Sequence, residues 1–84
     1  MSIWFRPTTI EQVLATFSGV RDINLHLDIR LIEIGDDFLR GSIPVAERTR
    51  QPFGLLHGGA SVVLAETLGS VASNLCIDTS KFYA

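Results

Sequence analysis

The chain has 84 residues, of which 46% are hydrophobic and 19% charged, and its formal net charge is −2. This length allows at most one small domain, and the composition predicts a folded chain rather than a disordered one. Because there is no basic patch, neither nucleic acid nor an anionic membrane is expected as a partner. One cysteine, Cys76, can form neither an internal disulfide nor a metal site alone. With no signal peptide and no apolar run of ~18 residues, we expect a cytoplasmic protein.

The first predicted element is a short helix that begins near Thr8 or Thr9 and ends at Gly19. Thr8 with Glu11, and Thr9 with Gln12, both have the spacing of a capping box. The small size of this helix indicates a side element or a lid rather than a core element.

The next two predicted elements form a β-hairpin. In LHLDIRL, residues 25–31, apolar side chains fall on every odd position, which is the period of a strand with one buried face. The phase then shifts at Ile32 and Ile34, as a β-bulge or a strand buried on both faces would require. GDD at 35–37 indicates a turn, and alternation resumes over 38–45.

A long helix is predicted over residues 58–75, after an irregular loop over 46–56. Glu66 is the only formally charged residue from 52 to 76. Because a solvent-facing helix surface normally carries several charges, we expect this helix to be covered on nearly all sides. Residues 81–84 are expected to begin another strand. Two helices and one hairpin leave sheet edges and faces uncovered, so partner chains or further sequence are expected to cover them.

Glu66 is the main candidate for chemistry. A carboxylate on a covered helix must form an ion pair, accept hydrogen bonds or have a raised pKa. Ser70 is its i+4 neighbour, and a partly desolvated acid beside a hydroxyl is typical of a general base or nucleophile. A structural acid bonded to backbone, or one that reaches a solvent gap, explains the pattern equally well.

The long helix begins with two glycines, Gly58 and Gly59, and His57 directly precedes it. Glycines allow a ligand to approach the backbone closely, and free N–H groups at the positive end of a helix suit an oxyanion. His57 is a possible second donor. Taken alone, the triplet is explained better as a glycine-rich turn with an incidental histidine.

Helix geometry separates these two candidate groups. Gly58 and Glu66 are eight residues apart, which is roughly 12 Å along the axis at ~1.5 Å per residue. They cannot act on one carbonyl within one chain. If both take part in catalysis, they come from different subunits, and two antiparallel copies of the helix about a two-fold axis would bring them together.

RTRQPFGLLHGGASVVLAETLGS, residues 48–70, closely resembles the central motif of hotdog-fold acyl-CoA thioesterases. The nearest branch hydrolyses aromatic acyl-CoA such as 1,4-dihydroxy-2-naphthoyl-CoA, or proofreads aryl-carrier proteins. Trp4 and IGDDFLRGSIPV at 34–45 fit the same family. The resemblance implies an α+β hotdog fold, in which an antiparallel sheet wraps a long central helix, and a homodimer, often a dimer of dimers.

The resemblance also implies roles for four residues in catalysis. Glu66 matches the catalytic carboxylate, acting as nucleophile or as general base on water. Gln51 matches the residue that holds the attacking water or the thioester. The Gly58 N–H matches the donor that polarises the thioester carbonyl, with His57 beside it. In the family, Glu66 works across the subunit boundary from His57 and Gly58.

Gly59 and Ser70 are implied as substrate-binding positions, with an acyl-CoA or acyl-carrier-protein thioester as substrate. No cofactor and no metal are implied, since coenzyme A is part of the substrate. Family members continue past the central helix with further strands. Residues 1–84 are therefore expected to be the N-terminal part of a single hotdog domain, lacking the C-terminal strands and having little hydrolase activity alone.

Two other functions are compatible with the sequence. The first is a non-catalytic hotdog protein that binds acyl thioesters or serves only in assembly. The second is hydration of enoyl thioesters, which ranks last because its Asp/His arrangement early in the helix is missing. The sequence alone determines neither the acyl group nor the choice between coenzyme A and a carrier protein.

Overall fold

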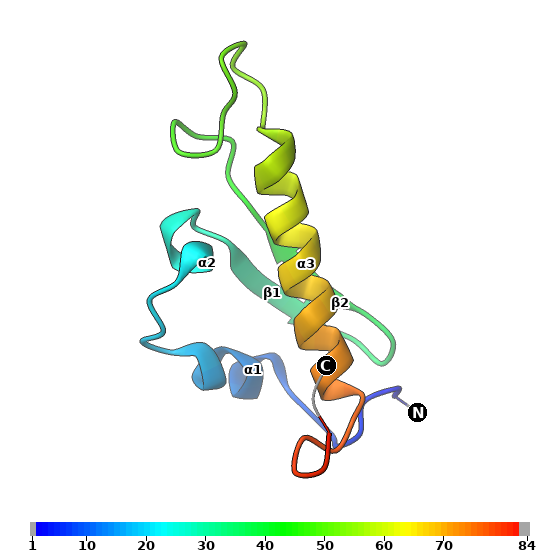
Figure 1. Cartoon of the computed structure of the whole chain (residues 1–84). Coiled ribbons are helices and arrows are strands. Elements are labelled where there is room, and N and C mark those ends of the chain that lie inside the picture. The colour runs from blue at the N-terminus through cyan, green and yellow to red at the C-terminus, as the bar shows by residue number, and fades with distance from the viewer. Residues whose placement is uncertain (1, 83–84) are drawn as a thin grey trace.

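The computed structural model describes residues 2–82 as one long helix packed on a two-stranded sheet, with two short helices beside them (Figure 1). In chain order the elements are α1 (Ile10–Phe17), α2 (Ile23–His26), β1 (Arg30–Ile34), β2 (Leu39–Ser42) and α3 (Gly58–Leu75). β2 and α2 contact α3, and α1 contacts β1. The expected α+β arrangement, a long helix against an antiparallel hairpin, is therefore present.

Helix α1 begins at the second of the two predicted capping boxes. Thr9 is the N-cap residue: its N–H donates to Gln12 Oε1 at 2.8 Å, and the Gln12 N–H donates to Thr9 Oγ1 at 3.3 Å. The Thr8 hydroxyl instead donates to the Arg6 carbonyl at 2.8 Å. Gly19 follows the helix with φ of 79°, a conformation that glycine adopts without strain.

The strand predicted over residues 25–31 is wrong for most of its length. One helical turn, α2, occupies Ile23–His26, and β1 begins only at Arg30. Asp22 caps this turn, because its Oδ1 accepts hydrogen bonds from two backbone N–H groups at 2.9 and 3.4 Å. Asp28 has φ of 58° and breaks the extended backbone. A local side-chain cap therefore overrides the apolar alternation.

The phase shift in the hairpin is a β-bulge, the first of the two predicted explanations. Leu31 pairs with Gly41 and Glu33 pairs with Arg40, so Ile32 is the extra residue in β1. The hairpin turn forms where it was predicted. Strand β2 ends at Ser42, so the alternation expected through Val45 extends beyond the paired residues.

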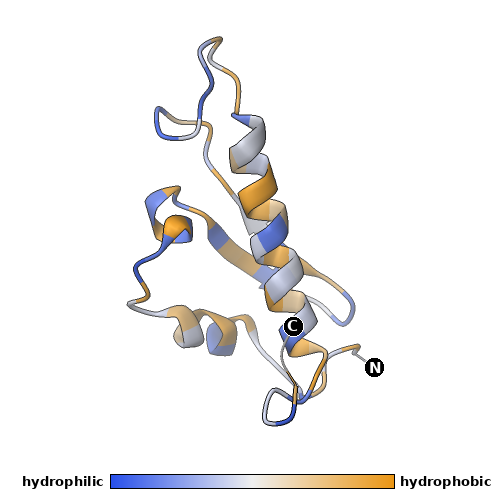
Figure 2. Cartoon of the chain, in the orientation of Figure 1, coloured by the Kyte–Doolittle hydropathy of each residue, from blue (hydrophilic) through white to orange (hydrophobic). Residues whose placement is uncertain are grey.

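Helix α3 has the predicted bounds, but it is not covered on nearly all sides within residues 2–82. Ala60 is its one buried residue in that range, and Val62 has 67% of its surface exposed. Figure 2 shows α3 mostly in white and orange, so small and apolar residues predominate along its surface. Such a surface needs cover from outside the described residues.

The chain after α3 forms a turn rather than the expected strand. The N–H groups of Lys81 and Phe82 both donate to the Asp78 carbonyl at 3.0 Å. The remainder of that prediction, Tyr83 and Ala84, lies outside the described residues. The Ser80 hydroxyl and N–H donate to the Asp78 carboxylate, and together with the nearby Arg6 guanidinium they lower the pKa of Asp78.

Trp4 connects the N-terminal segment to the hairpin turn. Its side chain is 8% exposed, and its Nε1–H donates to the Gly35 carbonyl at 2.6 Å. The neighbouring backbone continues this attachment, because Ile3 N–H donates to Asp36 O and Phe5 N–H donates to Leu75 O. The segment therefore joins the turn of the hairpin to the C-terminal end of α3.

We expect Trp4→Ala to lower the free energy of unfolding of the full-length protein by about 3 kcal/mol, because a large buried ring is lost. Trp4→Phe keeps most of the ring and removes the hydrogen bond, so about 1 kcal/mol is expected. Urea unfolding followed by circular dichroism measures both. Equal losses in the two variants would contradict the packing role of the indole ring.

Candidate active site

A tightly hydrogen-bonded loop leads into α3. Thr49 is 2% exposed, and its hydroxyl donates to the Pro44 carbonyl at 2.7 Å while accepting from Ala46 N–H at 2.9 Å. The Thr49 carbonyl in turn accepts from His57 N–H at 2.6 Å. Sequence reasoning missed Thr49, because a threonine between two arginines has no periodic or capping signal. It holds the start of α3 against the loop.

Gln51 lies in this loop and uses its side-chain oxygen to form a turn. Its Oε1 accepts from Phe53 N–H, its N–H donates to Leu55 O at 2.7 Å, and its carbonyl accepts from Gly54 N–H at 3.0 Å. Gly54 has φ of 84°, which explains the glycine there. Within residues 2–82 the Gln51 amide nitrogen has no hydrogen-bond partner, so its donors remain available.

His57 is the N-cap residue of α3. Its Nδ1 accepts a hydrogen bond from Gly59 N–H at 2.9 Å. An accepting Nδ1 carries no proton, so the neutral imidazole is protonated at Nε2 and offers an Nε2–H donor from an exposed ring. The histidine is therefore not incidental to the glycine-rich turn, because it caps the helix.

The two glycines at the start of α3 differ in what their N–H groups do. The Gly59 N–H is used by His57. The Gly58 N–H has no hydrogen-bond partner among residues 2–82, as expected for the first residue of a helix. A Cβ added at Gly58 would meet nothing within 4 Å, so the space beside its Cα is open.

Glu66 lies on an exposed part of α3 with its predicted neighbour Ser70. The Ser70 hydroxyl donates to Glu66 Oε1 at 2.9 Å, which leaves Oε2 available to a ligand or water. Within residues 2–82 no basic side chain forms an ion pair with Glu66. The carboxylate is therefore held by a hydroxyl rather than neutralised by a cation. The expected burial of this acid is not provided by the described residues.

Glu66 and Ser70 line a cleft of about 680 Å³ between α1, the N-terminal segment and α3. This volume is within the range of pockets that bind small molecules. Figure 1 shows α1 and α2 on the same side of α3. The other walls include aromatic, aliphatic and amide side chains, among them Phe5, Val13, Phe17, Asn24, Thr67 and Val71.

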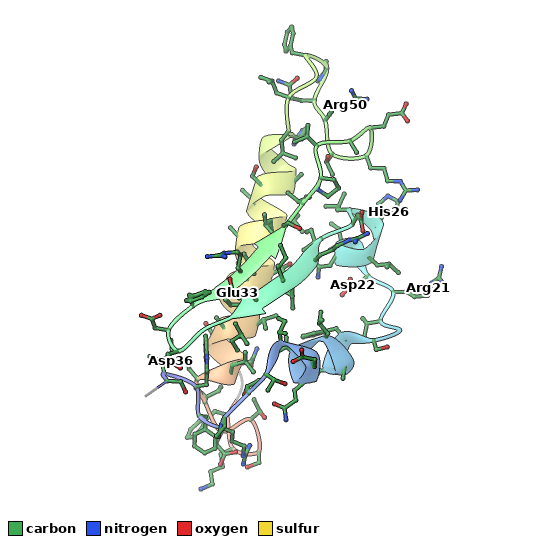
Figure 3. All side chains as sticks on the ribbon, turned by 180° about the vertical axis from the view of Figure 1, so that it is seen from behind. Arg21, Asp22, His26, Glu33, Asp36 and Arg50 are labelled. Atoms are coloured by element: carbon green, nitrogen blue, oxygen red, sulfur yellow. The ribbon has the colours of Figure 1, made fainter. Side chains whose placement is uncertain are left out.

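The structure thus gathers the predicted site residues into two groups. Glu66 and Ser70 share the cleft at the middle of α3, and none of the loop or helix-start residues lines it. His57 and the two glycines lie at the start of α3, and Gln51 lies in the preceding loop, next to Arg50, which Figure 3 labels. The groups are eight helical residues apart, or about 12 Å.

Within residues 2–82, no cluster of three or more His, Cys, Asp or Glu side chains could hold a metal ion. In the same range no helix has the length and apolar character needed to cross a membrane.

Comparison with known proteins gives clear relatives, although no family model matches the chain. The chain is 55% identical over 76 residues to 1,4-dihydroxy-2-naphthoyl-CoA hydrolase of Escherichia coli, a match that covers 90% of this chain and 54% of that protein. It is 53% identical over 73 residues to the proofreading thioesterase EntH of Cronobacter turicensis, covering 87% of this chain and 52% of EntH.

A solved structure agrees with the sequence comparison. A glutamine-to-alanine mutant of the thioesterase PA1618 from Pseudomonas aeruginosa superposes with a TM-score of 0.82 at 52% identity. The superposition covers 94% of this chain and 55% of that one. The chain therefore spans about half the length of the proteins it matches, and its helix and hairpin form an incomplete version of their fold.

We expect His57→Ala to destabilise the full-length protein by about 1 kcal/mol, because the N-cap side chain of α3 is lost. His57→Asn retains a capping oxygen, so it should destabilise the protein by only a few tenths of that amount. Thermal unfolding monitored by circular dichroism compares the two. An asparagine variant as unstable as the alanine variant would contradict the capping role.

Proposed function

We propose that this chain, a relative of the hotdog-fold thioesterases along nearly all of its length, is the N-terminal part of a single hotdog domain that hydrolyses acyl thioesters. The observation that carries the proposal is Glu66, held by Ser70 on the wall of a ligand-sized cleft. The substrate class is an acyl-CoA, in particular an aromatic one, or an acyl-carrier-protein thioester. The names of the Escherichia coli and Cronobacter relatives support that class.

Glu66 is the proposed catalytic carboxylate. As a general base, Glu66 removes a proton from water while the water oxygen forms the new C–O bond, the C–S bond breaks, and the proton passes from Glu66 to the departing thiolate. As a nucleophile, Glu66 forms a mixed anhydride with the acyl group as the C–S bond breaks, and water then hydrolyses the anhydride, which restores the carboxylate, releases the acid and supplies the proton for the thiolate. A thiol has a pKa of about 8.5, so its anion leaves without a strong acid beside it. The Ser70 hydroxyl holds one carboxylate oxygen and leaves the other for the reaction.

The start of α3 is the proposed oxyanion site. Gly58 has an N–H without a partner within residues 2–82, open space beside its Cα and the positive end of the helix dipole. The cap to Gly59 places the proton of His57 on Nε2, so the imidazole can be a second donor. The free amide donors of Gln51 would orient the attacking water or the thioester.

Each active site is proposed to contain residues of two subunits. The separation of about 12 Å between Gly58 and Glu66 prevents one helix from supplying both groups to one carbonyl. Two antiparallel α3 helices about a two-fold axis would place each acid near the other helix start. The exposed apolar surface of α3, including Val62 at 67%, would be covered in such a homodimer. A cytoplasmic location and assembly into a dimer of dimers belong to the same proposal.

Glu66→Gln should lower kcat of the full-length protein at least about 100-fold, because the base or nucleophile is lost. Its free energy of unfolding should not change, since the amide still accepts from Ser70. Release of coenzyme A from a panel of aliphatic and aromatic acyl-CoAs measures the effect. An unchanged kcat would overturn the role of Glu66, and binding without turnover by the unmutated protein would favour the non-catalytic alternative.

Complementation between two inactive variants tests the shared site. Gly58→Pro removes the proposed oxyanion donor while keeping a residue favoured at the first helical position, and His57 already has the extended backbone that precedes proline (φ −64°, ψ 134°). Gly58→Ala is the matched control, because it retains the N–H and its Cβ enters open space. Homodimers of Gly58→Pro or Glu66→Gln should be inactive, and Gly58→Ala should be active.

Consider a heterodimer in which one subunit carries Gly58→Pro and the other carries Glu66→Gln. If each site is shared between subunits, one of its two sites contains both substitutions and the other contains neither. The heterodimer should therefore recover about half of the unmutated activity. If each subunit held a complete site, both sites would carry one substitution and the heterodimer would stay inactive. Hydrolysis by a purified, doubly tagged heterodimer decides between these arrangements.

A further inference from the structure

Asn24 is a polar residue on the wall of the cleft that the proposed reaction does not use. It lies on α2, is half-buried, and lines the 680 Å³ cleft together with Glu66. It also borders an adjoining, largely apolar cavity of about 410 Å³. A polar group between two partly enclosed spaces is positioned to contact whatever occupies them.

Three hydrogen bonds hold Asn24 in place. Its backbone N–H donates to Asp22 Oδ1 at 2.9 Å, and its carbonyl accepts from Ile29 N–H at 2.9 Å. Figure 3 shows Asp22 at the base of α2. The side-chain Oδ1 accepts from Thr67 Oγ1 at 2.5 Å, which joins α2 to α3 across 43 positions of sequence. Asn24 is thus fixed at backbone and side chain, as a preorganised binding residue is.

The bond from Thr67 also decides which part of the amide remains available. Since Oδ1 already accepts a hydrogen bond, the unpaired groups of the amide are its two Nδ2–H donors. Among residues 2–82 no acceptor bonds to Asn24 Nδ2. Thr67 directly follows Glu66, so the residue that orients the amide is the chain neighbour of the proposed catalytic acid.

The rest of the cleft favours a flat apolar group. Phe5 and Phe17 supply two aromatic rings, and Val13 and Val71 supply aliphatic surface. A half-buried donor among such groups costs free energy when an apolar ligand leaves it unpaired, and discriminates strongly in favour of a ligand that carries an acceptor. The cleft is therefore suited to an aromatic ring that bears an oxygen substituent.

We propose that Asn24 is a specificity-determining residue that donates a hydrogen bond from Nδ2 to a ring oxygen of an aromatic acyl group, whose thioester carbonyl lies at Glu66. This inference rests on the proposed function, since it requires the acyl group to occupy the cleft beside that acid. The name of the Escherichia coli relative describes an acyl group of this chemical kind, an aromatic ring system with two hydroxyls. Asn24 selects hydroxylated rings over unsubstituted rings and alkyl chains.

Binding to the full-length Glu66→Gln protein tests the inference without turnover of the ligand. Titration calorimetry compares benzoyl-CoA with the three monohydroxybenzoyl-CoA isomers. At least one isomer should bind about tenfold more tightly than benzoyl-CoA, the effect of one hydrogen bond to an otherwise unpaired donor. Adding Asn24→Leu should remove this preference while leaving the affinity for benzoyl-CoA within about twofold.

Two further variants separate specificity from folding. Thr67→Val keeps the volume of the side chain but frees the amide to rotate, so the preference should fall without loss of benzoyl-CoA binding. Thr16→Val removes a hydroxyl from the α1 wall that already donates to Gln12 O, and the preference should persist. A preference that survives Asn24→Leu, or that is absent before Asn24 is changed, overturns the inference. Failure of the proposed function is seen separately, as no hydrolysis by the unmutated protein.

Discussion

The rise of the α-helix is the constraint on which the rest of this site depends. A helix advances ~1.5 Å per residue, and α3 places its acid eight residues after its first N–H donor. No side-chain rotamer removes a separation of about 12 Å. The proposed hydrolysis needs the acid and the oxyanion donor on one carbonyl, and this separation is the reason that the site is proposed to be shared between two helices.

The residues at the start of α3 combine structural and chemical roles. His57 caps the helix with Nδ1, and the same bond keeps the proton on Nε2, where it can reach a ligand. Gly59 uses its N–H for that cap, so the N–H proposed as the oxyanion donor is that of Gly58, which has no partner within residues 2–82. Thr49 anchors the backbone of His57 from the loop. Stability of the helix start and orientation of the donors therefore depend on the same few hydrogen bonds.

The middle of α3 has a different organisation. Glu66 accepts a hydrogen bond from Ser70 on the wall of the cleft, while the next residue, Thr67, orients the amide of Asn24 on α2. The proposed catalytic acid and the residue that orients the proposed specificity residue are thus adjacent in the sequence of α3. Aromatic and aliphatic side chains, Phe17 and Val71 among them, supply the apolar lining of the cleft.

The sequence by itself determined the elements whose signals are local or strongly periodic. The bounds of α3, the hairpin turn and the proximity of Ser70 to Glu66 follow from spacing along the chain. The phase shift at Ile32 left a bulge and a strand buried on both faces open, and the pairing of β1 with β2 shows the bulge. The resemblance to the thioesterase family could also be found from the sequence, because the motif at 48–70 lies within one continuous segment.

Only the tertiary structure decided what depends on contacts between distant segments or on competition between local bonds. Alternation over 25–31 favoured a strand, but the cap at Asp22 stabilises a helical turn there. That turn places Asn24 against Thr67, 43 residues further along the chain. The burial of Thr49 and the cleft between α1 and α3 likewise arise from packing, and packing partners leave no periodic trace in the sequence.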